Sequence, residues 1–78
     1  MMTKREFLSL FEEILEAAPG TLKGDDLLPG MEGWDSLAVV SLIAMVDEQF
    51  GITLSPKDIA KAGSVADLVG LLGDKIAP

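Results

Sequence analysis

The stretch GWDSLAVVSLIAMVDEQFG, residues 33–51, decides how the rest of this chain is arranged. Asp35 is a favoured capping residue at a helix start, and Gly51 is the favoured residue just past a helix end. The pattern therefore predicts a helix between them, and from Leu37 to Met45 only Ser41 is polar. A helix with so little polar surface is either buried on all sides or keeps one face for a partner, and a short chain cannot bury every side.

The length and composition of the chain predict one small globular domain over residues 1–78. Of the 78 residues, 49% are apolar and 24% charged, a balance typical of a folded protein with a single core. There is no cysteine, so we expect neither disulfides nor thiolate metal sites. No apolar run approaches the ~18 residues that a membrane-spanning helix needs, and the first residues lack the apolar segment of a secretory signal. We therefore expect a monomer in the cytoplasm, without membrane insertion.

The charge of the chain is strongly negative and unevenly distributed. The formal net charge is −7, which argues against a nucleic-acid partner because binding nucleic acid requires a basic patch. Between Gly24 and Pro56 there is no lysine or arginine, so the six acidic residues there give the segment a net charge of −6: Asp25, Asp26, Glu32, Asp35, Asp47 and Glu48. An acidic field of this kind attracts basic partner surfaces, although it also serves solubility.

The residue inventory predicts that the chain is not an enzyme. It has no histidine, cysteine or tyrosine, so the usual pairs of nucleophile and base cannot be assembled. Two pairs of adjacent carboxylates remain, Asp25-Asp26 and Asp47-Glu48. Neighbouring side chains on a helix point about 100° apart, so neither pair converges on a substrate or a metal ion. We expect no catalytic residue and no metal site.

The rest of the chain predicts further helices and no strands. Helix-start signals occur at TKRE (3–6), at Ser55-Pro56 and at Ser64, and Pro19-Gly20 is a stop signal. We expect helices at about 3–17, 36–50, 56–61 and 64–75. Because no segment alternates between apolar and polar residues for long enough to make a strand, the fold class is all-α. The architecture is a small four-helix bundle of three longer helices and one short one, with a long loop between helices 1 and 2.

The apolar positions predict which face of each element enters the core. In the helix over 3–17, three glutamates should point outward: Glu12, Glu13 and Glu16. The long loop should be anchored in the core by four residues: Leu22, Leu27, Leu28 and Trp34. In the helix over 36–50 the core face should comprise Val39, Leu42, Ile43, Val46 and Phe50, and the opposite face Leu37, Val40 and Ala44. That opposite face either forms a patch for another protein or is covered by the long loop.

The order of these elements and the residues around Ser36 resemble those of an acyl carrier protein. The resemblance covers essentially the whole chain and is carried by the WDSL motif at 34–37, by Val40, and by the closing segment DEQFGI at 47–52. It implies that Ser36 carries a 4′-phosphopantetheine, attached by a phosphopantetheinyl transferase that uses coenzyme A and magnesium. The thiol at the end of the arm would then hold an acyl group as a thioester.

The position of Ser36 suits such an attachment. At a helix N-terminus the free backbone amides and the helix dipole favour a phosphodiester, and a hydroxyl at a loop-helix junction is open to a separate enzyme. Asp35 would define the helix start and contact the transferase, next to Leu37. Along the helix we expect apolar partner contacts from Leu37, Val40 and Ala44, and steering of basic partners by Asp47 and Glu48.

Two departures from the fatty-acid pattern indicate the kind of carrier. Carriers of fatty-acid biosynthesis have acidic residues just after the Ser-Leu pair and again one turn later, where this chain has Ala38 and Ser41. Its recognition helix is therefore more apolar and less charged than that of the housekeeping type. The Trp-Asp-Ser-Leu start resembles the discrete carriers of specialised pathways, such as lipid modification, polyketide or aminoacyl-type systems. The expected partners are the acyl-loading and acyl-processing enzymes of such a pathway.

The sequence leaves three points open. The cargo is an acyl chain or, in an aminoacyl or peptidyl carrier of the same fold, an amino acid. The chain is either a modified carrier or an acidic helical interaction module that never receives the arm. The position of Ser36 within the WDSL motif favours the carrier. An acyl chain could enter a cavity lined by six residues, or the same residues simply form the core: Val39, Leu42, Ile43, Val46, Leu68 and Leu72.

Overall fold

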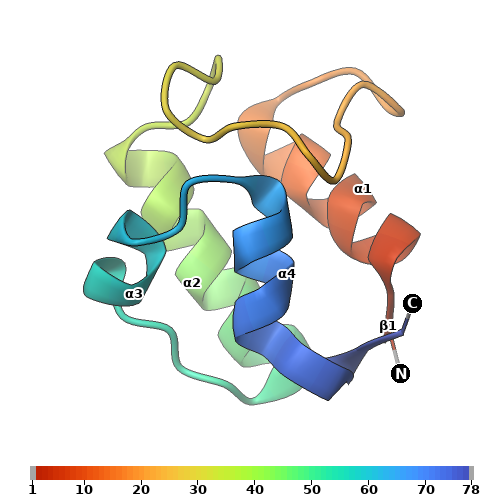
Figure 1. Cartoon of the computed structure of the whole chain (residues 1–78), viewed down its shortest axis with the longest axis vertical. Helices are drawn as coiled ribbons and strands as arrows, with labels where there is room; N and C mark the ends of the chain where they lie inside the picture. The colour runs from red at the N-terminus through yellow and green to blue at the C-terminus, as the bar shows by residue number, and fades with distance from the viewer. Residues whose placement is uncertain (1, 78) are drawn as a thin grey trace.

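The computed structural model describes residues 2–77 of the chain. This part contains four α-helices, one short 3₁₀ helix and a short pair of strands, joined by loops (Figure 1). The elements in order are β1 (Met2–Thr3), α1 (Lys4–Leu15), α2 (Ser36–Phe50), α3 (Pro56–Ala60), α4 (Val65–Leu72), the 3₁₀ helix η1 (Gly73–Lys75) and β2 (Ile76–Ala77). A long loop, drawn in orange and yellow, joins α1 to α2 and passes over one end of the helices (Figure 1). The predicted four-helix bundle, with one short helix and a long first loop, is confirmed.

Two of the helices start at capping boxes: the one at α1 was predicted, and at α3 the predicted serine cap proves to be a capping box as well. At α1 the Thr3 N–H donates to Glu6 Oε1 at 2.9 Å, and the Glu6 N–H donates back to Thr3 Oγ1 at 3.1 Å. Ser55 and Asp58 form the same reciprocal pair at α3. The hydrogen bond from the Thr3 N–H also holds the pKa of the exposed Glu6 carboxyl below its ordinary value of 4.5.

The ends of two helices differ from the prediction. α1 ends at Leu15 rather than near residue 17, because Glu16 adopts the left-handed conformation with φ 58°. Its N–H donates to the carbonyls of Glu12 and Glu13, which closes the helix. The segment predicted as one helix over 64–75 divides into α4 and η1 at Gly73, which has a φ of 59°.

The prediction of no strand was wrong for the ends of the chain. Met2 pairs with Ile76 and Thr3 pairs with Ala77, so that β1 and β2 form a parallel two-stranded sheet. A pairing of two residues per strand is too short to produce an alternating pattern of apolar and polar residues, so the sequence carried no signal for it. The pairing brings the two ends of the described chain side by side (Figure 1).

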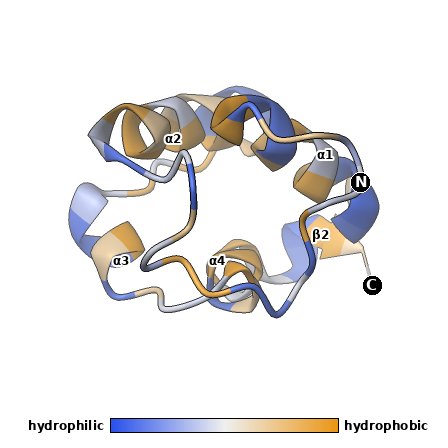
Figure 2. Cartoon of the chain, turned by 90° about the horizontal axis from the view of Figure 1, so that it is seen from above, coloured by the Kyte–Doolittle hydropathy of each residue, from blue (hydrophilic) through white to orange (hydrophobic). Residues whose placement is uncertain are grey.

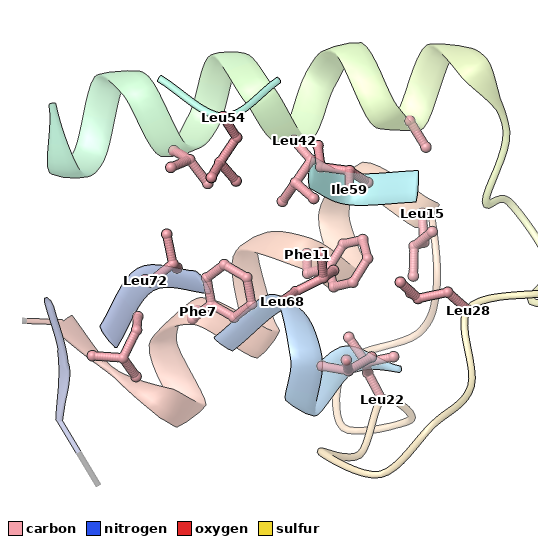
Figure 3. Close-up of a cluster of buried hydrophobic side chains, with 14 residues drawn as sticks. Phe7, Phe11, Leu15, Leu22, Leu28, Leu42, Leu54, Ile59, Leu68 and Leu72 are labelled. Carbon is pink, nitrogen blue, oxygen red and sulfur yellow. The ribbon is translucent and has the colours of Figure 1, made fainter. Parts of the chain in front are cut away.

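The core lies between two layers of helices. Seen from above, α1 and α2 form one layer and α3 and α4 the other, with apolar faces turned inward (Figure 2). Every helix from α1 to α4, together with the loops and β2, contributes buried apolar side chains (Figure 3). The buried set is Phe7, Phe11, Leu15, Leu22, Leu28, Ala38, Leu42, Val46, Leu54, Ile59, Val65, Leu68, Leu72 and Ile76.

The core face of α2 is rotated relative to the prediction. The buried residues of this helix are Ala38, Leu42 and Val46, whereas the predicted Val39, Ile43 and Phe50 are half-buried at its edges. Because nearly every residue in the first half of α2 is apolar, the sequence pattern has little directional content there. The packing of the neighbouring elements decides which apolar residue lies innermost, and at the start of α2 this residue is the small Ala38.

Glu12 is buried, contrary to the prediction that it points outward. Its side chain is 5% exposed, and its Oε2 accepts a hydrogen bond of 2.9 Å from the backbone N–H of Leu22. The long loop folds back over α1 at this point, and its buried amide needs an acceptor. Glu12 therefore fastens the loop to the helix. Glu13 and Glu16 are exposed as predicted.

Leu27 is exposed, contrary to the prediction that it anchors the loop. Leu22 and Leu28 are buried and Trp34 is half-buried, but 69% of Leu27 is exposed. Successive side chains of an extended segment point to opposite sides, so the burial of Leu28 turns Leu27 outward. The sequence pair Leu27-Leu28 could not indicate which of the two enters the core.

Candidate functional site

Ser36 lies at the first position of α2 and is exposed. The capping role at this helix belongs to Asp35, whose Oδ1 accepts a hydrogen bond of 2.9 Å from the Ala38 N–H. At α3 and α4, by contrast, the hydroxyls of Ser55 and Ser64 themselves accept the capping hydrogen bonds. The Ser36 hydroxyl is therefore not needed for the cap and is presented to solvent at the positive end of the helix dipole.

Gly33 and Trp34 hold the segment in front of Ser36 in place. Gly33 has a φ of 84°, and a Cβ at this position would lie 2.6 Å from the carbonyl oxygen of Leu15, at the end of α1. Only glycine permits both this conformation and this close approach. The Trp34 ring then packs edge-to-face against Phe11, with 5.5 Å between ring centroids. These contacts tie the start of α2 to α1.

An apolar groove of about 430 Å³ opens beside Ser36. It is lined by Leu28, Pro29, Trp34, Ser36, Val39, Val40, Pro56, Ile59, Ala60 and Ala62. Two of these residues, Leu28 and Ile59, are buried and also belong to the core cluster (Figure 3). Ser36 contributes the one hydroxyl among these side chains, so a chain attached there could lie along an apolar surface. Among the six residues suggested for an internal cavity, only Val39 lines this groove.

The outer face of α2 carries the predicted partner-facing residues. Leu37 is 74% exposed, Val40 is 63% exposed, and Ala44 is also exposed, so the long loop does not cover them. Asp47 and Glu48 are exposed near the other end of the helix. The helix thus presents an apolar start and an acidic end. Apolar patches of this kind are typical of protein contact surfaces.

The described residues contain neither a metal-binding group nor a membrane-spanning helix. Within residues 2–77, no group of three or more histidine, cysteine, aspartate or glutamate side chains converges as metal ligands would. None of the helices in this part of the chain is both long and apolar enough to cross a membrane.

The sequence of the chain matches a known protein family. Residues 5–72 match the model of the family described as the phosphopantetheine attachment site. The chain belongs to this family. Phosphopantetheine-attachment domains carry 4′-phosphopantetheine covalently, and such carrier domains are generally not catalytic themselves. They work with a phosphopantetheinyl transferase and with biosynthetic enzymes. No solved structure matches the chain at a significant level.

The residues at the start of α2 fit the arm that this phosphopantetheine-attachment family carries. Ser36 offers an exposed hydroxyl that takes no part in capping, and the adjoining groove offers apolar surface to a flexible chain. Sequence reasoning missed the far wall of this groove, formed by Pro56, Ile59 and Ala60. These residues are distant from Ser36 in the sequence, and only the packing of α3 against α2 brings them near it.

Proposed function

We propose that this chain is an acyl carrier whose 4′-phosphopantetheine arm is attached to the hydroxyl of Ser36. The observation that carries the proposal is that Asp35, and not Ser36, caps α2. The exposed Ser36 hydroxyl is therefore available for modification. When bound, the arm supplies a thiol that holds an acyl group as a thioester. A second serine at a helix start, Ser64, lacks this freedom because its hydroxyl accepts from the Asp67 N–H.

The residues around Ser36 have distinct roles in this proposal. Asp35 fixes the first turn of α2, so that the Ser36 hydroxyl has a defined direction when the transferase approaches. The positive end of the helix dipole stabilises the negative charge of a phosphodiester at that hydroxyl. Trp34 from the long loop and Ile59 from α3 both line the groove and shield an apolar chain from water.

The outer face of α2 favours a carrier of a specialised pathway. Leu37 and Val40 dominate this face near Ser36, and the first exposed acidic pair of the helix comes only at Asp47 and Glu48. Ala38, at a position that is acidic in carriers of fatty-acid synthesis, is buried. Partner enzymes would therefore contact this carrier through apolar surface near the modified serine, and through basic groups further along.

An aminoacyl or peptidyl carrier is the second candidate, and the same apolar start of α2 supports it. The two candidates differ in the enzyme that loads the thiol: an acyltransferase or acyl ligase in one case, an adenylating ligase for amino acids in the other. Incubating the modified carrier with each class of loading enzyme, and measuring the mass of the product, distinguishes them.

The attachment itself is tested by intact-mass measurement after incubation with coenzyme A, magnesium and a promiscuous phosphopantetheinyl transferase. We expect the natural chain to gain one phosphopantetheine, and the Ser36→Ala variant to gain none while keeping its fold. Ser41→Ala, on the same helix, is the matched control and should be modified like the natural chain. A gain of the arm by the Ser36→Ala variant would contradict the assignment.

A further inference from the structure

A second hollow lies on the other side of Pro29 from the groove beside Ser36. Its volume is about 630 Å³, and it is formed by the end of α1 and by the long loop. Pro29 lines both hollows, so the surface around Ser36 continues across this residue into the second hollow. An enzyme that reaches Ser36 from the loop side therefore covers Pro29 and meets the second hollow.

Leu27 is an exposed apolar side chain on the rim of this second hollow, and its backbone is fixed. The Val65 N–H donates to the Asp26 carbonyl at 2.9 Å, and the Leu28 N–H donates to the Gly63 carbonyl at 3.1 Å. Leu27 itself forms a bridge with Ser64 at the start of α4. A large apolar side chain on a fixed backbone adds contact area at a low cost in conformational entropy, which favours binding.

The charged residues that line the second hollow are all acidic: Glu16, Asp26 and Glu32. They surround apolar surface from Leu27 and from the half-buried Met31. A surface of this kind is complementary to an apolar side chain flanked by lysine or arginine. No lysine or arginine is among the lining residues; Lys23 lies between Leu22 and Asp26 in the sequence, but it does not line the hollow.

We propose that the phosphopantetheinyl transferase docks on this second hollow as well as on α2, packing an apolar side chain against Leu27 and placing a basic group near Glu32. The inference rests on the proposed attachment at Ser36. In this arrangement, Leu27 on the loop and Leu37 on α2 flank the serine as two separate apolar contacts. Neither contact takes part in the chemistry, so the loss of Leu27 weakens docking and leaves the turnover of bound carrier unchanged.

The test compares Leu27→Ser with Leu71→Ser in steady-state modification by a promiscuous phosphopantetheinyl transferase. Leu71 is a matched control because it is a partly exposed leucine on α4 that lines neither hollow. We expect Leu27→Ser to raise KM about tenfold with kcat unchanged, the effect of losing one strong interface contact. Leu71→Ser should leave both constants unchanged. Equal KM values for the two variants would overturn the inference.

The acidic lining is tested with Glu32→Lys against Glu13→Lys. Both residues are exposed, but only Glu32 lines the second hollow. We expect Glu32→Lys to slow association several-fold at low salt, with the difference vanishing at high salt, and Glu13→Lys to have a smaller effect. An equal effect of the two substitutions would reduce the role of Glu32 to general charge and contradict the proposed basic contact.

Failure of this inference is distinguishable from failure of the proposed function. Attachment of the arm at a residue other than Ser36 would contradict the proposed function, whatever the Leu27 comparison gives. Binding of the transferase to the Ser36→Ala variant, measured by calorimetry, repeats the comparison without turnover. A Kd that Leu27→Ser leaves unchanged in that background would overturn the second docking contact alone.

Discussion

The helices α1 and α2 lie in the same layer of the fold, but their outer faces differ in kind. α1 buries Phe7, Phe11 and Leu15, and its exposed positions include the polar Arg5 and Ser9. Packing and solvation explain this arrangement completely. α2 buries one stripe in the same way and yet exposes two large apolar side chains, Leu37 and Val40. Folding alone does not explain that exposure, so the comparison separates a scaffold helix from a helix with a surface for partners.

Truncation of a buried aromatic residue in α1 should cause the largest effect. Phe11 is fully buried and contacts both Phe7 and Trp34. We expect Phe11→Ala to lower the free energy of unfolding by about 3–5 kcal/mol, because a cavity remains where the ring was. Urea denaturation measures this loss.

Val40→Ser is the counterpart on the outer face of α2. Since Val40 is 63% exposed, we expect its truncation to change the free energy of unfolding by no more than about 0.5 kcal/mol. Comparable losses for Phe11→Ala and Val40→Ser would break the distinction between the two helices, because they would make Val40 a structural residue.

The junction between the two helices should be the next most sensitive place. Gly33→Ala forces an L-residue into a φ of 84° and places its Cβ against the backbone of Leu15. We expect a loss of more than about 1–2 kcal/mol, the cost of the left-handed conformation alone, together with a shift in Trp34 fluorescence.

Gly30→Ala isolates the conformational part of that effect, so its difference from Gly33→Ala gives the steric part. Gly30 has a similar φ of 83°, but a Cβ there meets no atom within 4 Å. Gly30→Ala should therefore show only the conformational cost and should leave the Trp34 environment unchanged. If the two variants lose equal stability, then the close approach of Gly33 to α1 is not what holds the start of α2.

The smallest expected effect lies at the start of α1 and depends on pH. The Thr3 N–H lowers the pKa of Glu6 from its ordinary value of 4.5, so the ionised carboxylate stabilises the folded state. This contribution is complete above the ordinary value and is lost as the pH falls through the lowered pKa. Glu6→Gln does not titrate, so its deficit in Tm relative to the natural chain should shrink between pH 7 and pH 3. A deficit that is constant over this range would contradict the role assigned to the charge.

The sequence predicted α2 well because both of its ends carry strong local signals. Asp35 and Gly51 mark its bounds, and the structure places the helix between them as expected. The sequence did not predict the end of α1, which is shorter than expected. Glu16 ends the helix in a left-handed conformation that its residue type does not indicate. Local capping chemistry can be read from a sequence, whereas an end imposed by the fold cannot.

The features of the candidate site likewise divide into those that the sequence predicted and those that depend on packing. Exposure of Ser36 and of the apolar face of α2 followed from the motif and from helical spacing, and the structure agrees with both. The burial of Glu12 and the exposure of Leu27 did not follow, because both depend on how the long loop folds over α1. A loop without periodicity gives no directional signal, so its contacts become known only once the packed structure is known.

The parallel pairing of β1 with β2 has a practical consequence for how the molecule is handled. Met2 and Ala77 belong to adjacent strands on the side of the fold far from the long loop and from the start of α2 (Figure 1). A tag, linker or immobilising anchor joined at either end is therefore attached on this side of the fold, but because the strands are parallel the two ends leave it in opposite directions. Either anchor keeps the support away from Ser36, and exchanging the anchored end would change the tilt at which the molecule is held.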